Sequence, residues 1–155
     1  MDPPLLQRLL AEAYFRLPPP KSTGRELFHR AWLDERLAGR ALPPAVVQST
    51  LCELTATSIA QGILHLARAR PSEVLICGGG ARNLELLRRL AARLPGSQVA
   101  TTAGYGVAPE QVEAAGFAWL AHAFLEGAAG NLVAVTGARG PRPLGALYRG
   151  RVTGL

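Results

Sequence analysis

The most informative segment of the chain is residues 73–83, which read EVLICGGGARN. Residues 73–77 form a short, largely apolar and partly β-branched run, which is typical of a strand buried in a parallel sheet. Three glycines follow this run, and a helical pattern begins at Asn83. The segment therefore predicts a strand, a tight glycine turn and a helix.

The glycine turn lies at the carboxyl end of a predicted strand, where ligands bind in open α/β sheets. Glycines allow the backbone to approach a ligand closely, and the start of a helix offers free N–H groups and a positive dipole end. These features indicate a nucleotide site at residues 78–83. The segment lacks the Gly-x-Gly-x-x-Gly and Gly-Lys-Ser/Thr patterns of other phosphate loops. A plain tight turn, with Asn83 only as a helix N-cap, explains the same residues.

Apolar residues recur at helical spacing both before and after this segment. We expect helices over residues 4–16, 30–37, 43–69, 83–94 and 109–126, and strands over 73–77, 98–102 and 146–148. The alternation of strands and helices indicates an α/β fold with parallel strands and helical crossovers. Only two of the strands are convincing, and a two-stranded sheet is marginal by itself. The sequence looks like the second half of an α/β domain whose first strands are missing.

The composition is that of a globular protein, and we expect residues 1–155 to form one domain. The 155 residues are 48% hydrophobic and 18% charged. The net charge of +6 is spread along the chain and aromatic residues make up only 6%, so no nucleic-acid interface is indicated. Cys52 and Cys77 form no Cys-x-x-Cys pair. We see neither a signal peptide nor a long apolar run, so we expect a soluble, cytoplasmic protein that binds no membrane.

Other polar and aromatic residues have both a functional and a simpler interpretation. The loop at residues 21–23 offers a lysine and two hydroxyls to a phosphate or carboxylate, although most such loops are only solvated. Residues 101–102 end a predicted strand and could hydrogen-bond a ligand. Glu113 suits a helix N-terminus, and we expect Phe117 and Trp119 in the core. The histidines, whose spacing fits no metal site or catalytic triad, are His29, His65 and His122.

Taken together, five motifs resemble those of the anhydro-N-acetylmuramic acid kinases. They are PKSTGRELF at residues 20–28, LTATSIA at 54–60, CGGGARN at 77–83, EAAGFAWLA at 113–121 and NLVAVTGA at 131–138. Two positions depart from the family pattern: Ala103 stands where we expect Asp, and Gly116 where we expect Ala. The loss of the acid at position 103 puts in doubt whatever contact that carboxylate makes in the family.

The resemblance implies an actin-like, sugar-kinase-type (ribonuclease H-like) fold of two α/β domains around a cleft. This chain would be part of the helix-rich C-terminal domain. The family uses ATP with magnesium to cleave the 1,6-anhydro ring of its amino sugar with water and to phosphorylate O6, in cell-wall recycling. The adenosine-side motif would comprise Gly78, Gly79, Gly80, Ala81 and Asn83.

The family's phosphate loop and its catalytic aspartate have no counterpart in residues 1–155, so we expect a segment that is inactive alone. One hypothesis is a kinase segment that needs its N-terminal part to bind ATP and the sugar productively. Another is a non-catalytic remnant that binds a nucleotide or partner, which Ala103 favours. An oxidoreductase half fits poorly, because the chain lacks the dinucleotide fingerprint. An unpaired apolar edge beside residues 74–77 predicts homo-oligomers or a complementing chain.

Overall fold

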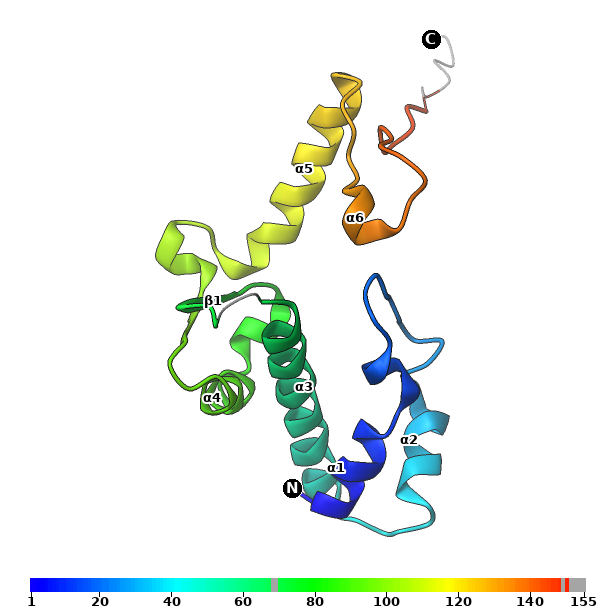
Figure 1. The fold of residues 1–155 in the computed structure, drawn as a ribbon, viewed down its shortest axis with the longest axis vertical. Helices are drawn as coiled ribbons and strands as arrows, with labels where there is room; N and C mark the ends of the chain where they lie inside the picture. Colours follow the sequence, from blue (N-terminus) through cyan, green and yellow to red (C-terminus); the bar gives the residue numbers. More distant parts are fainter. Residues whose placement is uncertain (68–69, 149, 151–155) are drawn as a thin grey trace, which may run out of the picture. The chain divides into compact units, whose positions relative to one another are not determined.

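The computed structural model describes residues 1–67, 70–148 and 150. The chain forms two compact units, Met1–Glu110 and Gln111–Leu155. The regular elements of both units are mainly helices, and the described residues contain one small parallel sheet, which lies in the first unit (Figure 1). The α/β class expected from the sequence is therefore present in a helix-rich form.

The first unit begins with α1 (Pro3–Leu10), which a single aspartate fastens to its surroundings. Asp2 caps the helix, because its Oδ1 accepts from the Leu5 N–H at 2.8 Å. Both carboxylate oxygens of Asp2 also accept from Arg40 at 2.8 Å, and the Asp2 N–H donates to the Thr50 hydroxyl at 2.8 Å. Arg40 and the helix N–H together hold the pKa of Asp2 below its ordinary value.

The helix expected over residues 4–16 is wrong in its second half, where the structure has a short 3₁₀ turn, η1 (Ala13–Arg16). Glu12 leaves the helical conformation at φ −55° and ψ 128°. Its carboxylate accepts from Trp32 Nε1 at 2.8 Å and from Arg36 Nη2 at 2.7 Å. Both partners lie on α2 (Arg30–Leu37), so the contacts of Glu12 with α2 override the local helical pattern.

The long helix α3 (Pro44–Leu66) contributes residues to both apolar clusters of the first unit. One cluster buries Leu5, Leu9, Trp32 and Leu54 from α1, α2 and α3. The other buries Ala60, Leu90 and Leu94, with Ile63, Val74, Ile76 and Val99 packed against them. The apolar side chains of α3 are only partly buried, since Ile59 and Leu66 are exposed. The last expected residues of this helix, 68 and 69, lie outside the described part.

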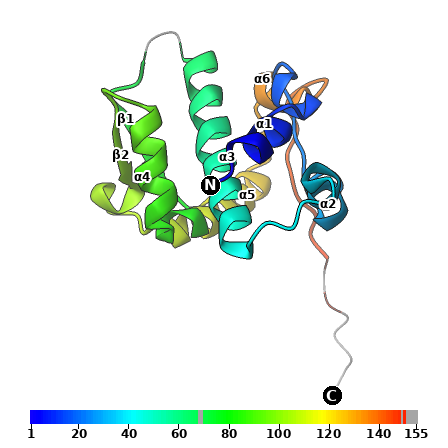
Figure 2. The same cartoon turned by 90° about the horizontal axis from the view of Figure 1, so that it is seen from below.

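The sheet consists of β1 (Glu73–Ile76) and β2 (Gln98–Thr101). The two strands are parallel, as predicted, with Val74 opposite Val99 and Ile76 opposite Thr101. The crossover helix α4 (Leu84–Arg93) packs beside the strands (Figure 2). The 3₁₀ turns η3 (Thr102–Tyr105) and η4 (Pro109–Gln111) follow the sheet.

The second unit is built on α5 (Val112–Leu125) and the short α6 (Val133–Thr136), which the pattern did not predict. The expected strand over 146–148 is wrong, because those residues have no regular structure. The expectation that Phe117 and Trp119 are core residues is also wrong, since they are 65% and 56% exposed. The segment after α5 packs against Leu120 and Phe124 of the helix, which lie beside Gly130 and Gly145.

Candidate functional site

The glycine turn begins at Gly78, directly after β1. Gly78 has φ 74° and ψ −171°, a conformation that is essentially restricted to glycine. Its N–H donates to the Pro109 carbonyl at 2.8 Å, which anchors the turn to the segment that precedes α5. The conformation of the backbone therefore explains the glycine at this position.

Gly79 needs a different explanation, because its φ is not in the left-handed region. A Cβ at Gly79 would meet no heavy atom within 4 Å, whereas at Gly80 it would meet only the Leu86 side chain at 3.8 Å. The described fold thus leaves room for a side chain at Gly79. Close approach of a ligand to this backbone would explain the glycine.

The turn continues as η2 (Gly79–Arg82) and leads into α4 through Asn83. Asn83 is the N-cap, as the sequence suggested, because its Oδ1 accepts from the Leu86 N–H at 3.0 Å. Ala81 is buried and anchors the turn, while Arg82 forms an exposed ion pair with Glu110 at 3.3 Å. The capping role and a ligand-binding role are compatible, since the cap uses only the oxygen of the Asn83 amide.

A second strand end lies at the same edge of the sheet as the glycine turn. Because β1 and β2 are parallel and Ile76 is opposite Thr101, residues 77–78 and Thr102 follow neighbouring strand ends. The Thr102 hydroxyl is buried and has no hydrogen-bond partner among the described residues. A buried hydroxyl without a partner is costly, so this oxygen is suited to a polar ligand atom or a water. Cys77, at this edge, is exposed and has a free thiol.

A groove of about 560 Å³ lies between α3 and the first half of α4. It is lined by Gln48, Ser49, Leu51, Cys52, Thr55, Asn83, Glu85 and Arg89. Of these residues, sequence reasoning had singled out only Asn83 as a site residue. The family-like motif LTATSIA contains Thr55, and this motif was the one signal that could have indicated the α3 wall.

Ion pairs give the groove its polar wall. Glu85 accepts from Arg88 at 2.8 Å and from Arg89 at 2.6 Å, and these hydrogen bonds lower its pKa to about 2. Arg89 also donates to the Ser49 carbonyl at 2.6 Å and to the Glu53 carboxylate at 2.9 Å. Because the guanidinium is engaged on several sides, it shapes the groove and is not a free anion-binding group.

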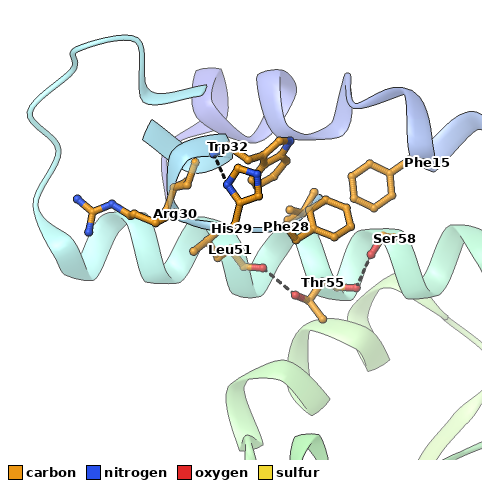
Figure 3. Close-up of a pocket in the computed structure, with 10 residues that line it drawn as sticks. Phe15, Phe28, His29, Arg30, Trp32, Leu51, Thr55 and Ser58 are labelled. Atoms are coloured by element: carbon orange, nitrogen blue, oxygen red, sulfur yellow. Dashed lines mark hydrogen bonds between the residues drawn. The ribbon is translucent and has the colours of Figure 1, made fainter. Parts of the chain in front are cut away.

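A separate apolar pocket of about 440 Å³ lies between α2 and α3, with Phe15, Phe28 and Trp32 in its wall (Figure 3). Its polar side chains already have partners within the chain: Arg30 pairs with the Asp34 carboxylate, and the others bond to the backbone. His29 Nδ1 accepts from the Trp32 N–H at 3.2 Å, and the Thr55 hydroxyl donates to the Leu51 carbonyl at 2.9 Å. The pocket thus offers mainly apolar surface.

Two further sequence candidates, Lys21 and Glu113, lie where a simpler role explains them. Lys21 Nζ donates to the Tyr14 and Phe15 carbonyls at 2.9 and 3.2 Å, so the ammonium fastens a loop. Glu113 lies in the first turn of α5, as expected. The described residues hold no group of three or more His, Cys, Asp or Glu side chains that could bind a metal. None of the described helices is long and apolar enough to cross a membrane.

Comparison with known proteins identifies relatives over nearly the whole chain. The family model for anhydro-N-acetylmuramic acid kinase matches residues 1–150. The kinase of that name from Xanthomonas axonopodis pv. citri (strain 306) is 55% identical over 148 residues, covering 96% of this chain and 39% of the relative. That from Pseudomonas paraeruginosa (strain DSM 24068 / PA7) is 54% identical over 145 residues, covering 93% and 40%. The chain thus spans about two fifths of the length of these curated relatives.

Proposed function

Because this chain belongs to the anhydro-N-acetylmuramic acid kinase family, we propose that it is the nucleotide-binding, C-terminal portion of such a kinase. Family membership implies the actin-like kinase fold, in which the helices and the small sheet form part of one domain. The observation that carries the proposal is the open space at Gly79, at the carboxyl end of a parallel strand. The complete enzyme would cleave the anhydro ring and phosphorylate O6 of the sugar.

The proposed site takes the adenosine side of ATP. Gly78 turns the chain after β1, Gly79 and Gly80 allow a ligand to approach the backbone closely, and the buried Ala81 anchors the turn. The side-chain N–H₂ of Asn83 is available as a donor, because the helix cap occupies only the oxygen. The groove between α3 and α4 adjoins Asn83 and offers both apolar and polar surface, as nucleoside sites do.

Magnesium finds no carboxylate-rich ligand set among the described residues, because they bring together no group of three or more His, Cys, Asp or Glu side chains. We therefore assign the metal to no residue here. Mg·ATP supplies the phosphoryl group when it binds, and the residues of this chain bind and orient the nucleotide. Phosphoryl transfer depends on phosphate positioning and nucleophile orientation, so we propose that the chain alone does not turn over.

Isothermal titration of the chain with Mg·ATP tests this proposal. We expect binding that Gly79→Val weakens by about tenfold or more, since the added side chain would occupy the space of the ligand. Gly62→Ala is the matched control, because a Cβ at Gly62 in α3 also meets no heavy atom within 4 Å. A folded chain that does not bind the nucleotide, or that binds it equally well as the Gly79→Val variant, would refute the assignment.

A non-catalytic remnant is the second candidate, and Ala103 is the observation that favours it. Ala103 lies in η3, next to the buried Thr102 hydroxyl, where the family pattern led us to expect an acid. A coupled assay of ADP release distinguishes the two candidates. It mixes this chain with the part of a relative that the chain does not match. Turnover in the mixture supports the kinase portion. Turnover only after Ala103→Asp supports the remnant.

A further inference from the structure

The apolar pocket between α2 and α3 has the size and the lining of a small-molecule site. Its volume is about 440 Å³, and ligand pockets typically enclose about 300–1,000 Å³. Phe15, Phe28 and Trp32 form part of its wall (Figure 3). The proposed nucleotide site does not include this pocket, although Leu51 and Thr55 line both the pocket and the groove between α3 and α4.

The aromatic wall of the pocket is held in place by contacts within the chain. The rings of Phe15 and Phe28 are stacked with their centroids 5.7 Å apart, and the ring of Trp32 is perpendicular to that of Phe28 at 5.0 Å. The indole N–H of Trp32 donates to the Glu12 carboxylate at 2.8 Å. The wall therefore presents apolar ring surface, and a ligand does not have to order these side chains when it binds.

The polar atoms of the pocket have defined donor and acceptor roles. His29 Nδ1 accepts from the Trp32 N–H at 3.2 Å, so the neutral ring carries its hydrogen on Nε2 and offers a donor there. On α3, the Thr55 hydroxyl donates to the Leu51 carbonyl at 2.9 Å, and the Ser58 hydroxyl donates to the Thr55 carbonyl at 3.1 Å. Because these hydrogens are engaged, both hydroxyl oxygens face a ligand as acceptors.

The charge around the pocket favours a neutral ligand. Of the described residues that line it, only Arg30 has a permanent charge. Arg30 Nε donates to both carboxylate oxygens of Asp34, at 2.8 and 2.9 Å, and the guanidinium extends away from the aromatic rings (Figure 3). Because Asp34 neutralises this cation, the pocket does not select an anion.

We propose that this pocket binds a small, uncharged molecule that carries a carboxamide on an apolar ring. The ring packs against the aromatic wall, the carboxamide oxygen accepts from His29 Nε2, and the carboxamide N–H₂ donates to the hydroxyl oxygens of Thr55 and Ser58. A carboxylate lacks the donor that these oxygens need, and a hydrocarbon lacks both partners. The inference does not depend on the proposed function, since it uses none of the residues of the glycine turn.

Fluorescence titration of the full 155-residue chain with benzamide tests the proposal. The chain has two tryptophans, so Trp119→Phe leaves Trp32 of the pocket wall as the one indole that reports binding. We expect a saturable change in the Trp32 emission. Benzamide should bind about tenfold more tightly than toluene or benzoate, which is the net contribution of one or two hydrogen bonds.

Two substitutions test the polar contacts in the same background. Thr55→Val and His29→Asn should each reduce the preference for benzamide over toluene to about twofold or less, because valine lacks the oxygen and asparagine caps α2 without the ring donor. Thr136→Val is the matched control and should leave the preference unchanged. The Thr136 hydroxyl also donates to the carbonyl four residues earlier, but it lies in the other unit. The comparison of the three ligands requires neither substitution, so a variant that fails to fold does not remove the test.

Several outcomes would overturn the inference. If benzamide causes no saturable change, or if toluene binds as tightly as benzamide, the polar atoms do not select a carboxamide. The same conclusion follows if both substitutions leave the preference intact. An emission that changes with protein concentration in the absence of ligand would identify a second copy as the occupant. Displacement of benzamide by Mg·ATP would make the pocket a part of the nucleotide site.

Discussion

Replacing Glu53 with glutamine should destabilise the first unit strongly, because this carboxylate joins α3 to α4 from a nearly buried position. Its side chain is 12% exposed, and it accepts from Arg89 Nη1 at 2.9 Å and from Arg93 Nε at 2.8 Å. Burial tends to raise the pKa of Glu53, but the hydrogen bonds and charges of Arg93 and Arg89 outweigh it and hold the pKa below its ordinary value. The carboxylate is therefore ionised in the folded protein at neutral pH.

The expected loss is about 2–3 kcal/mol in the free energy of unfolding. Hydrogen bonds to charged groups contribute about 1.5–3 kcal/mol each, and Glu53→Gln weakens those that the carboxylate accepts from two arginines without removing them all. Arg89 keeps the Ser49 carbonyl at 2.6 Å and Glu85 at 2.6 Å, which limits the cost of the unpaired charge. Breaking a fully buried pair costs about 3–5 kcal/mol, so the estimate lies below that range.

Urea unfolding at pH 7, followed by circular dichroism at 222 nm, measures this loss. The control is Glu35→Gln, because Glu35 is 71% exposed and lies 3.3 Å from Arg36. An exposed pair of this kind contributes about 0–1 kcal/mol. If Glu53→Gln lowers the free energy of unfolding by no more than Glu35→Gln does, the ion pairs between α3 and α4 do not stabilise the fold.

Three further predictions concern charge and backbone. The folded structure lowers the pKa of Glu85 from 4.5 to about 2. Its ion pairs therefore stabilise the fold above pH 4.5, and this stabilisation is lost as the pH falls towards 2. The difference in urea midpoint between the unsubstituted chain and Glu85→Gln should disappear over the same pH interval. Gly116→Ala should raise the free energy of unfolding by about 0.5–1 kcal/mol, because a Cβ inside α5 meets no heavy atom within 4 Å, and a lower melting temperature would contradict this. Gly78→Ala should cost about 1–3 kcal/mol through its φ of 74°, whereas Gly79→Ala should change urea stability by less than about 0.5 kcal/mol; equal losses would refute the backbone argument.

The parts of the fold that sequence reasoning predicted are those set by local patterns. β1, the glycine turn, the Asn83 cap and α4 follow one another within a few residues, and each has its own signal. The break at Glu12 depends on Trp32, twenty residues further along, so no local pattern reveals it. The exposure of Trp119 could not be predicted either, because an apolar pattern identifies a side chain that should be covered and not what covers it.

The candidate site divides in the same way. The glycine turn was predictable, because a strand followed by glycines and a helix is a contiguous signal. The groove wall at Thr55 was not, since it exists only where α3 packs against α4. Lys21 shows the opposite error: its charge suggested an anion site, but the ammonium donates to the Tyr14 and Phe15 carbonyls.

The position of α3 between two apolar clusters has a consequence for how the first unit opens. Leu54 belongs to the cluster with α1 and α2, and Ala60, less than two turns further on, belongs to the cluster with α4 and the sheet. If either cluster loses its packing, apolar side chains of α3 become exposed to water. Amide hydrogens along the middle of α3 should therefore exchange with deuterium at one common, slow rate, as a single cooperative unit. The amide hydrogens of the glycine turn, which lies outside α3, can then exchange sooner, while the helix that forms the groove wall stays folded.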